Sequence, residues 1–258
     1  MAKLVHLVAD YGEDDPAFSE VVHRLKSRDR SIQVQKTSMP RFSTIATGFW
    51  INQLAVNNPE ISDAAVYANT APRKHDEEAQ KQNSGEELVY ADIEGGLPVI
   101  AVNSGYSLSF IKKNVKELRK VDVPSEGSQF RSRDYFPEAV ADILNDEKDS
   151  VGEKISLENI PERPKNRVAF IDGYGNIKTS IRHSEVDMRE GSPVHVEIDG
   201  VSKKIFYESG TFSVPEGEIS FAPGSSGGSD PFMEIFYRGG SAAEKFGKPD
   251  TGQKIKIQ

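Results

Sequence analysis

The sequence contains no cysteine among its 258 residues. This absence excludes a disulfide framework, a thiolate nucleophile and a cysteine-based metal site. The five histidines, at positions 6, 23, 75, 183 and 195, are not spaced as metal ligands are. We therefore expect neither cysteine chemistry nor a metal centre.

Long apolar runs and an excess of positive charge are also missing. The run from Leu4 to Ala9 is too short to span a membrane, and no signal-peptide pattern opens the chain, so we expect a cytoplasmic protein with no membrane partner. The formal net charge of −8 argues against a general nucleic-acid binder, which needs Lys and Arg to displace counterions from phosphates. The chain also lacks the phosphate-binding P-loop, the Gly-x-Ser-x-Gly elbow and the dinucleotide-binding Gly-x-Gly-x-x-Gly sequence.

What is present is a change of pattern along the chain. Residues 1–151 alternate strand-like and helix-like segments, which predicts an α/β domain with a central sheet layered by helices. Residues 152–166 are polar and contain two prolines, as a linker does. Residues 167–258 contain short strands and tight turns, which predicts a small all-β domain, a barrel or a sandwich.

The pattern also predicts individual elements. In the first part we expect strands at 4–9, 32–37, 64–68, 88–93 and 98–102, helices at 15–27, 45–56, 108–118 and 135–144, and an exposed loop at 73–87. In the second part we expect strands at 167–171, 177–181, 194–198, 203–207, 219–222 and 232–237, and one short helix at 241–246.

Asp10 follows the first expected strand and is the first candidate for binding. Ligands of α/β sheets bind beyond the carboxyl ends of strands, and a carboxylate there suits the two hydroxyls of a ribose. The alternative is that Asp10 only caps the helix that follows. Phe42, just before the second expected helix, is either a ligand contact or a hydrophobic staple.

Five short motifs, taken together, point to a family. They are Ala-Asp-Tyr-Gly (9–12), Val-Tyr-Ala-Asn-Thr (66–70), Phe-Arg-Ser-Arg-Asp-Tyr-Phe (130–136), Ile-Asp-Gly-Tyr-Gly-Asn-Ile (171–177) and Tyr-Arg-Gly-Gly-Ser-Ala-Ala (237–243). In order and spacing they resemble the S-adenosylmethionine (SAM) hydroxide adenosyltransferase and halogenase family, of which this chain looks like a divergent member. The resemblance implies a homotrimer that holds SAM between the N-terminal domain of one subunit and the barrel domain of the next. It implies no cofactor beyond the substrate SAM.

The resemblance also implies which residues bind the substrate. They are Asp10 for the ribose, Phe42 for the nucleoside, Tyr174 and Asn176 for adenine and the methionine portion, Ser225 and Ser226 for the methionine carboxylate and amino group, and Arg238 and Gly239 for the adenine edge. Arg238 stands where the family has Asn. Tight turns in a small β-domain are the alternative explanation for the glycines.

The water-activating group of the hydrolytic members is replaced in this chain. Their Asp falls on Tyr67, their His falls on Arg131, and their downstream Arg falls on Lys74, with Arg73 beside it. Of these three positions, only Lys74 keeps the charge of the family's residue.

The halogenating members are closer at the same positions. Tyr67, Thr70 and Ser132 match the residues that line their halide site, where hydroxyls and backbone N–H groups could hold an anion stripped of water. The alternative for Thr70 and Ser132 is that they are ordinary loop hydroxyls that satisfy backbone groups. The same two segments supply three more substrate-binding candidates: Asn69, Arg133 and Asp134.

These observations predict an enzyme that directs a nucleophile at C5′ of SAM. We expect hydrolysis to adenosine and L-methionine, the commonest reaction of the family. One alternative is a 5′-halo-5′-deoxyadenosine synthase that uses a halide. The other is a catalytically silent binder of SAM or adenosine.

Overall fold

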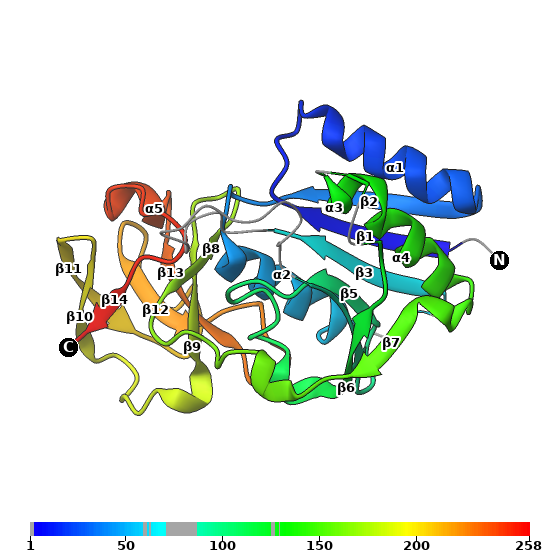
Figure 1. The fold of residues 1–258 in the computed structure, drawn as a ribbon. Helices are drawn as coiled ribbons and strands as arrows, with labels where there is room; N and C mark the ends of the chain where they lie inside the picture. Colours follow the sequence, from blue (N-terminus) through cyan, green and yellow to red (C-terminus); the bar gives the residue numbers. More distant parts are fainter. Residues whose placement is uncertain (1–2, 59–60, 62, 71–86, 125–126, 129) are drawn as a thin grey trace, which may run out of the picture. The chain divides into compact units, whose positions relative to one another are not determined.

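The computed structural model describes residues 3–58, 61, 63–70, 87–124, 127–128 and 130–258. The chain divides into two compact units, Met1–Glu162 and Arg163–Gln258 (Figure 1). The fold class predicted from the sequence is confirmed, because one unit is an α/β domain and the other is a small all-β domain.

The described part of the first unit contains seven strands, four α-helices and three 3₁₀ helices. They are β1 (Lys3–Ala9), α1 (Pro16–Arg28), β2 (Ile32–Ser38), α2 (Thr44–Ala55), β3 (Ala64–Asn69), β4 (Leu88–Ile93), β5 (Val99–Val102), η1 (Lys112–Asn114), β6 (Val115–Val121), α3 (Arg131–Asp134), α4 (Phe136–Leu144), η2 (Lys148–Ser150), β7 (Val151–Lys154) and η3 (Leu157–Asn159).

The strands of the first unit form one sheet in the order β2-β1-β3-β5-β4-β6-β7. The four strands β2, β1, β3 and β5 are parallel, whereas β4, β6 and β7 pair antiparallel. The strands expected at 88–93 and 98–102 form the antiparallel hairpin of β4 and β5, and Gly95 in its turn is in the left-handed region at a φ of 62°. The parallel strands all end at one edge, which is where α/β proteins place their ligands.

Helices cover this sheet because its buried strands are apolar on both faces. Leu7 of β1, Leu25 of α1 and Val140 of α4 belong to one buried cluster, so α1 and α4 pack on the same face. Figure 1 shows α2 on the opposite face, in contact with β1 and β3. The start of α1 follows from its sequence: Asp15 accepts a hydrogen bond from the Ala17 N–H at 2.9 Å, and Pro16 occupies the first turn.

The helix predicted at 108–118 is wrong. The structure has turns and η1 there, followed by strand β6, which pairs with β4. Val115, Leu118 and Val121 are buried at intervals of three residues, which imitates a helical pattern. The register of β6 with β4 is irregular between Val115 and Glu117, and Val121 belongs to the buried cluster of α1 and α4 whereas Leu118 does not. Burial on both faces of the sheet, together with this irregularity, therefore produces the interval of three on a strand.

The segment predicted as a linker carries structure of its own. Most of β7 lies in it and pairs with β6 at the edge of the first sheet, and η3 follows. The division between the two units falls between Glu162 and Arg163, inside this segment.

The second unit contains seven strands, one α-helix and one 3₁₀ helix. They are β8 (Val168–Ile171), β9 (Ile177–Arg182), η4 (His183–Glu185), β10 (Pro193–Ile198), β11 (Val201–Tyr207), β12 (Ile219–Pro223), β13 (Phe232–Tyr237), α5 (Ala242–Lys245) and β14 (Ile255–Ile257). Of these elements, only strand β14 and the short helix η4 were not predicted from the sequence.

The sheet of the second unit curls into a nearly closed, barrel-like shape. Its strand order is β14-β10-β11-β12-β13-β9-β8, and the two ends of that order meet. The Val168 N–H donates to the Gln253 carbonyl at 2.9 Å, and Arg167 bridges to Lys254. Phe221 and Ile235 are fully buried in its core.

Candidate functional site

Asp10 lies at the carboxyl end of β1, as predicted. Its carboxylate accepts a hydrogen bond from the Phe42 N–H at 2.9 Å, and Phe42 has a left-handed φ of 62°. Asp15, and not Asp10, caps α1. Asp10 therefore stabilises the strained turn that presents Phe42, whose side chain is 39% exposed.

Tyr67 lies in the middle of the first unit's core. Its side chain is fully buried, and its hydroxyl donates to the backbone carbonyl of Ser132 at 3.0 Å. Burial raises the pKa of Tyr67 well above its ordinary value. Tyr67 is thus a neutral group whose single proton is already donated within the protein, and it cannot act as the carboxylate base that the family places there.

Thr70 takes part in a buried chain of hydroxyls. Its Oγ1 lies 2.8 Å from Thr47 Oγ1 of α2, and Thr47 in turn donates to the Ser43 carbonyl at 3.0 Å. Because Thr47 has only one proton, the proton between the two threonines belongs to Thr70. Ser104 donates to the backbone carbonyl of Thr70. The Thr70 hydroxyl therefore has no proton left for an anion.

Tyr11 connects Asn69 with Ser132 and was not singled out from the sequence. Asn69 Nδ2 donates to the Tyr11 hydroxyl at 2.5 Å, and the Tyr11 ring meets Phe18 edge-on, with centroids 5.2 Å apart. Burial raises the pKa of Tyr11, and side-chain hydrogen bonds from Ser132 and Asn69 oppose that rise. The only signal in the sequence was its place beside Asp10.

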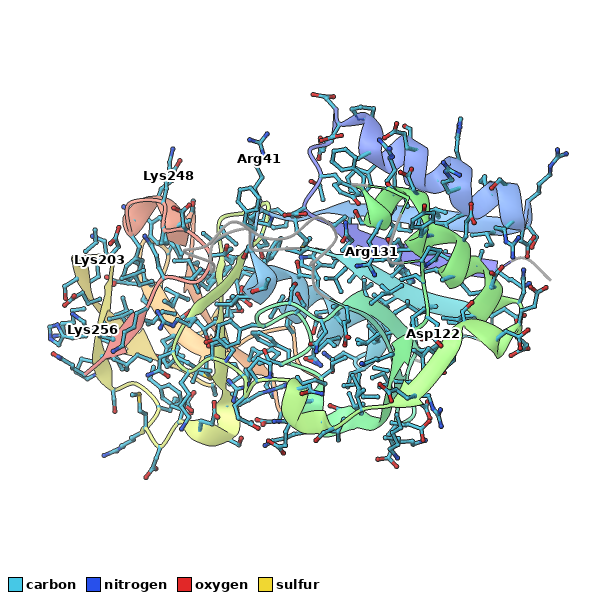
Figure 2. All side chains as sticks on the ribbon, viewed as in Figure 1. Arg41, Asp122, Arg131, Lys203, Lys248 and Lys256 are labelled. Carbon is cyan, nitrogen blue, oxygen red and sulfur yellow. The ribbon has the colours of Figure 1, made fainter. Side chains whose placement is uncertain are left out.

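Arg131 is the first residue of α3. Its guanidinium lies 5.4 Å from the ring centroid of Phe136, and its Nε is buried without a hydrogen-bond partner among the described residues. Figure 2 shows the side chain inside the first unit, whereas the side chain of Arg41 extends away from the ribbon. The structure thus places a cation against an aromatic face at the position of the family's His.

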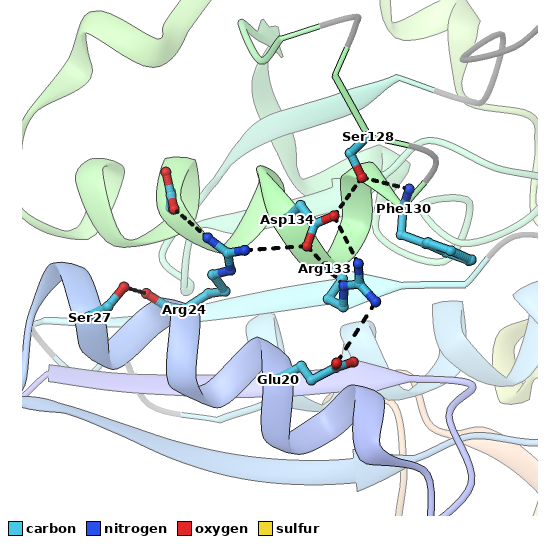
Figure 3. Close-up of polar contacts among 8 residues, drawn as sticks. Glu20, Arg24, Ser27, Ser128, Phe130, Arg133 and Asp134 are labelled. Atoms are coloured by element: carbon cyan, nitrogen blue, oxygen red, sulfur yellow. Dashed lines mark hydrogen bonds and ion pairs between the residues drawn. The ribbon is translucent and has the colours of Figure 1, made fainter.

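Arg133 and Asp134 are paired with each other and with α1 (Figure 3). Arg133 donates to both carboxylate oxygens of Asp134, at 2.9 and 3.0 Å, and lies 3.8 Å from Glu20. Ser128 donates to Asp134 at 2.5 Å, and Arg24 lies 3.5 Å from it. The hydrogen bonds from Arg133 and Ser128 lower the pKa of Asp134 to about 2. These contacts join α3 to α1. Arg73 and Lys74 lie outside the described residues.

The second unit contains a cavity of about 700 Å³. Four aromatic side chains line it: Tyr174, Phe212, Phe236 and Tyr237. Tyr174 and Phe212 are 84% and 69% exposed, and the Phe212 and Phe236 rings are 4.8 Å apart. Exposed aromatic walls of this kind offer stacking surfaces to a planar ligand. A smaller hollow of about 380 Å³ shares Tyr174 with it.

Asp172 shapes the turn that presents Asn176 to this cavity. Its carboxylate accepts from the Tyr174 N–H and the Asn176 N–H at 3.0 Å each, and from Asn176 Nδ2 at 2.9 Å. Burial alone would raise the pKa of Asp172, but the hydrogen bonds from Asn176 and the charge of Lys178 hold it below its ordinary value. Asn176 is 8% exposed, and its Oδ1 has no hydrogen-bond partner among the described residues.

Two charged residues in the cavity lining were missed from the sequence. Lys178 of β9 and Glu234 of β13 are 8% and 4% exposed and join in an ion pair of 2.6 Å. The strand registers place them directly opposite each other. The only sequence signal was the alternation of β9, which puts Lys178 on the same face as Asn176.

The remaining predicted residues divide into two groups. Ser225 and Gly239 line the cavity. Ser226 is buried, and its carbonyl accepts from the Phe232 N–H at 2.7 Å. Arg238 is not in the lining, since its guanidinium donates to the Val214 carbonyl at 2.7 Å and fixes the loop that carries Phe212.

The part of the chain that the structure describes offers neither a metal site nor a membrane-spanning helix. Among the residues that the structure describes, no group of three or more His, Asp or Glu side chains is placed to hold a metal ion. No helix in the described ranges combines the length and apolar character needed to cross a membrane.

The second unit resembles a known protein family in sequence. Residues 166–255 match the family model described as the SAM hydroxide adenosyltransferase C-terminal domain. No curated protein matches the chain significantly.

Two solved structures resemble the whole chain in fold. An uncharacterized conserved protein from Thermotoga maritima aligns with a TM-score of 0.74 at 16% identity, over 98% of this chain and 100% of that one. A conserved hypothetical protein from Thermus thermophilus aligns with a TM-score of 0.70 at 18% identity, over 99% of this chain and 100% of that one. At these identities the likeness establishes the fold alone. The family match goes further for the second unit alone: residues 166–255 are similar to the C-terminal domain of SAM hydroxide adenosyltransferases, as the sequence motifs predicted.

Proposed function

We propose that the protein binds SAM and directs water to its C5′ carbon, which releases adenosine and L-methionine. The observation that carries this proposal is the cavity of the family-matched domain, whose lining includes exposed aromatic side chains and Asn176, a residue with a buried oxygen that has no hydrogen-bond partner among the described residues. A cavity of about 700 Å³ lies within the usual range for small-molecule sites.

The fit to an adenine nucleoside is chemical as well as spatial. Tyr174 and Phe212 offer faces on which a purine can stack, and Asn176 Oδ1 offers an acceptor for its exocyclic amine. Ser225, at the cavity wall, is placed to donate to a carboxylate. These groups bind the substrate but do not themselves carry out the substitution.

The nucleophilic substitution at C5′ needs few catalytic groups from the protein. The oxygen of water forms a bond to C5′, the C5′–S bond breaks, and its electron pair goes to the sulfonium, so methionine leaves as a neutral thioether. The proton of the attacking water passes to solvent. Holding the two reactants in line and excluding other water is the main contribution that such a site makes.

One observation favours a second candidate, a SAM or adenosine binder without turnover. The Tyr67 hydroxyl, at the position of the family's water-activating Asp, is buried and donates to Ser132. Because the protons of Tyr67 and Thr70 are both committed within the protein, the halide alternative has few donors left at those positions.

Incubation of the pure protein with SAM, with and without chloride, separates these functions. Chromatography of the nucleosides should show adenosine in both samples. Unchanged SAM together with measurable SAM binding would identify the silent binder, and a chlorinated nucleoside would identify the halide enzyme. Absence of binding to both SAM and adenosine would refute the proposal.

Arg131→His offers a sharper test of the chemistry. An imidazole at this position restores one member of the family's water-activating group, so adenosine release should rise relative to the wild type. Arg41→His, at an exposed arginine, is the matched control and should change nothing. An unchanged rate with retained SAM affinity would count against a reaction centre at Arg131.

We also propose a homotrimer in the cytoplasm, as the family resemblance implies. Light scattering coupled to size-exclusion chromatography should then give about three times the 28.5 kDa mass of one chain. A monomer at micromolar concentration would contradict this assembly.

A further inference from the structure

The wall of the cavity in the second unit carries two polar side chains from one face of β9. Asn176 directly precedes the strand and Lys178 is its second residue, so alternation points both to the same side, and both line the cavity. Each is more than nine-tenths buried. Their hydrogen-bonding partners decide which atoms each one can offer to a ligand.

The orientation of the Asn176 amide is fixed by chemistry. The Asp172 carboxylate, when ionised, can only accept hydrogen bonds, so the Asn176 atom that lies 2.9 Å from it must be the NH₂ group. The other amide atom, Oδ1, is then the one that lacks a partner. Asn176 therefore offers the ligand an acceptor and not a donor.

The position of the Lys178 ammonium is fixed in a similar way. Glu234 holds it at 2.6 Å from the opposite strand, and Asp172 lies 3.4 Å away. An ammonium has three N–H donors; Glu234 accepts one, and Asp172 lies at ion-pair distance. Lys178 can therefore offer the ligand at least one donor, beside the acceptor of Asn176.

We propose that Lys178 is a specificity-determining residue that reads the purine base. Its ammonium donates to the ring nitrogen beside the exocyclic amine of adenine, while Asn176 Oδ1 accepts from that amine. This inference rests on the proposed function, since it concerns the base of the same ligand. It goes further because it assigns recognition of a purine ring nitrogen to Lys178, and it adds discrimination between adenine and hypoxanthine through the neighbouring Asn176.

Hypoxanthine reverses part of this pattern. Its carbonyl oxygen replaces the exocyclic amine and would face Asn176 Oδ1, so that two acceptors meet without a proton between them. A site built to bond an N–H group rejects an analogue that lacks it, because its own buried polar group is left unpaired. Inosine should therefore bind at least about tenfold more weakly than adenosine.

Calorimetry with four nucleosides tests the contact from the ligand side. The wild-type protein is titrated with adenosine, inosine, 1-deazaadenosine and 7-deazaadenosine, where each deaza analogue replaces one ring nitrogen by carbon. The analogue that lacks the ring nitrogen contacted by Lys178 should bind about tenfold or more weakly than adenosine, because it loses the hydrogen bond from this charged donor. This measurement needs no protein variant and so cannot fail through misfolding.

The variant Lys178→Met/Glu234→Met tests the same contact from the protein side. It removes both partners of the 2.6 Å ion pair, and the Asp172 carboxylate, which loses its contact with Lys178, keeps its hydrogen bonds from Tyr174 and Asn176. It should bind adenosine about tenfold more weakly and should no longer distinguish adenosine from the sensitive deaza analogue. The matched control is Lys256→Met/Glu197→Met, a cross-strand ion pair of 2.6 Å on β14 and β10 outside the cavity lining.

The outcomes separate this inference from the proposed function. If adenosine binds but both deaza analogues bind equally well, or if the Lys178 variant keeps the wild-type preference, the inference is overturned and the proposed function stands. If neither SAM nor adenosine binds the wild type, both are overturned. Loss of affinity for one analogue that disappears in the Lys178 variant supports the inference.

Discussion

The polar candidates of the two units differ in their surroundings. In the first unit Tyr67 donates to Ser132, Thr70 donates to Thr47, and Arg133 is paired with Asp134. Arg131 is the exception there, because its buried Nε has no hydrogen-bond partner among the described residues. In the second unit Asn176 also has a buried oxygen without a partner among the described residues, and this residue belongs to the lining of a cavity.

This difference agrees with where the family match lies. The match covers residues 166–255, which lie in the second unit, whereas Tyr67, Thr70 and Arg131 lie in the first unit. The internal hydrogen bonds of Tyr67 and Thr70 satisfy buried polar groups of the first unit.

The largest expected effect concerns the buried ion pair of the second unit. Lys178→Met alone should lower the free energy of unfolding by about 3–5 kcal/mol, because Glu234 is left buried without a counter-charge. Lys178→Met/Glu234→Met should lie within about 1 kcal/mol of the wild type. Urea denaturation measures both. Equal losses in the single and double variants would show that packing, and not charge, dominates here.

A smaller effect is expected at Arg238. Arg238→Ala removes charged hydrogen bonds to the carbonyls of Val214 and Phe212, which should destabilise the loop by about 1–3 kcal/mol and weaken adenosine binding through Phe212. Calorimetry and urea denaturation measure the two effects. Arg189→Ala, at an exposed arginine of the same unit, is the control. If Arg238 instead contacts adenine itself, affinity would fall without any change in stability.

Tyr67→Phe tests whether the Tyr67 hydroxyl of the first unit is structural or takes part in the reaction. The substitution removes the hydroxyl that donates to Ser132 and should lower the free energy of unfolding by about 1 kcal/mol, without changing adenosine affinity. Thermal denaturation and calorimetry measure the two. A large fall in adenosine release at unchanged stability would make Tyr67 part of the reaction and would break the contrast between the units.

The smallest effect concerns acid stability in the first unit. The pKa of Asp134 is about 2 in the folded chain, below its ordinary value of 3.8, so the ionised carboxylate stabilises the fold above about pH 4. This contribution is lost as the pH falls from about 4 to about 2. Asp134→Asn should therefore be less stable than the wild type at neutral pH, and the difference should shrink over that range. Asp122→Asn, at an exposed carboxylate, is the control (Figure 2).

Local signals were enough to predict most elements. Asp15 and Pro16 mark the start of α1, and Asp199-Gly200 marks the turn between β10 and β11, where both residues have positive φ. A helix was wrongly predicted at 108–118 because a helix and an irregular strand can have the same spacing of apolar residues. Pairing with β4, which local sequence does not encode, decided between them.

The candidate site was predictable only in part. The motifs placed Tyr174, Asn176, Ser225 and Gly239 together, and all four line the cavity. Lys178 was missed because its role depends on Glu234, which lies 56 residues away in the chain. Arg238 was assigned to the ligand, but its guanidinium is directed to the loop at 212–214.

The sequence by itself determined most of the elements, the turn around Asp172 and the family that residues 166–255 resemble, because these follow from neighbouring residues and short motifs. Only the tertiary structure decided which polar groups remain available for a ligand. Thr70 finds its acceptor 23 residues away and Tyr67 finds its own 65 residues away. A proton can be donated only once, and its acceptor is known only when the chain has folded.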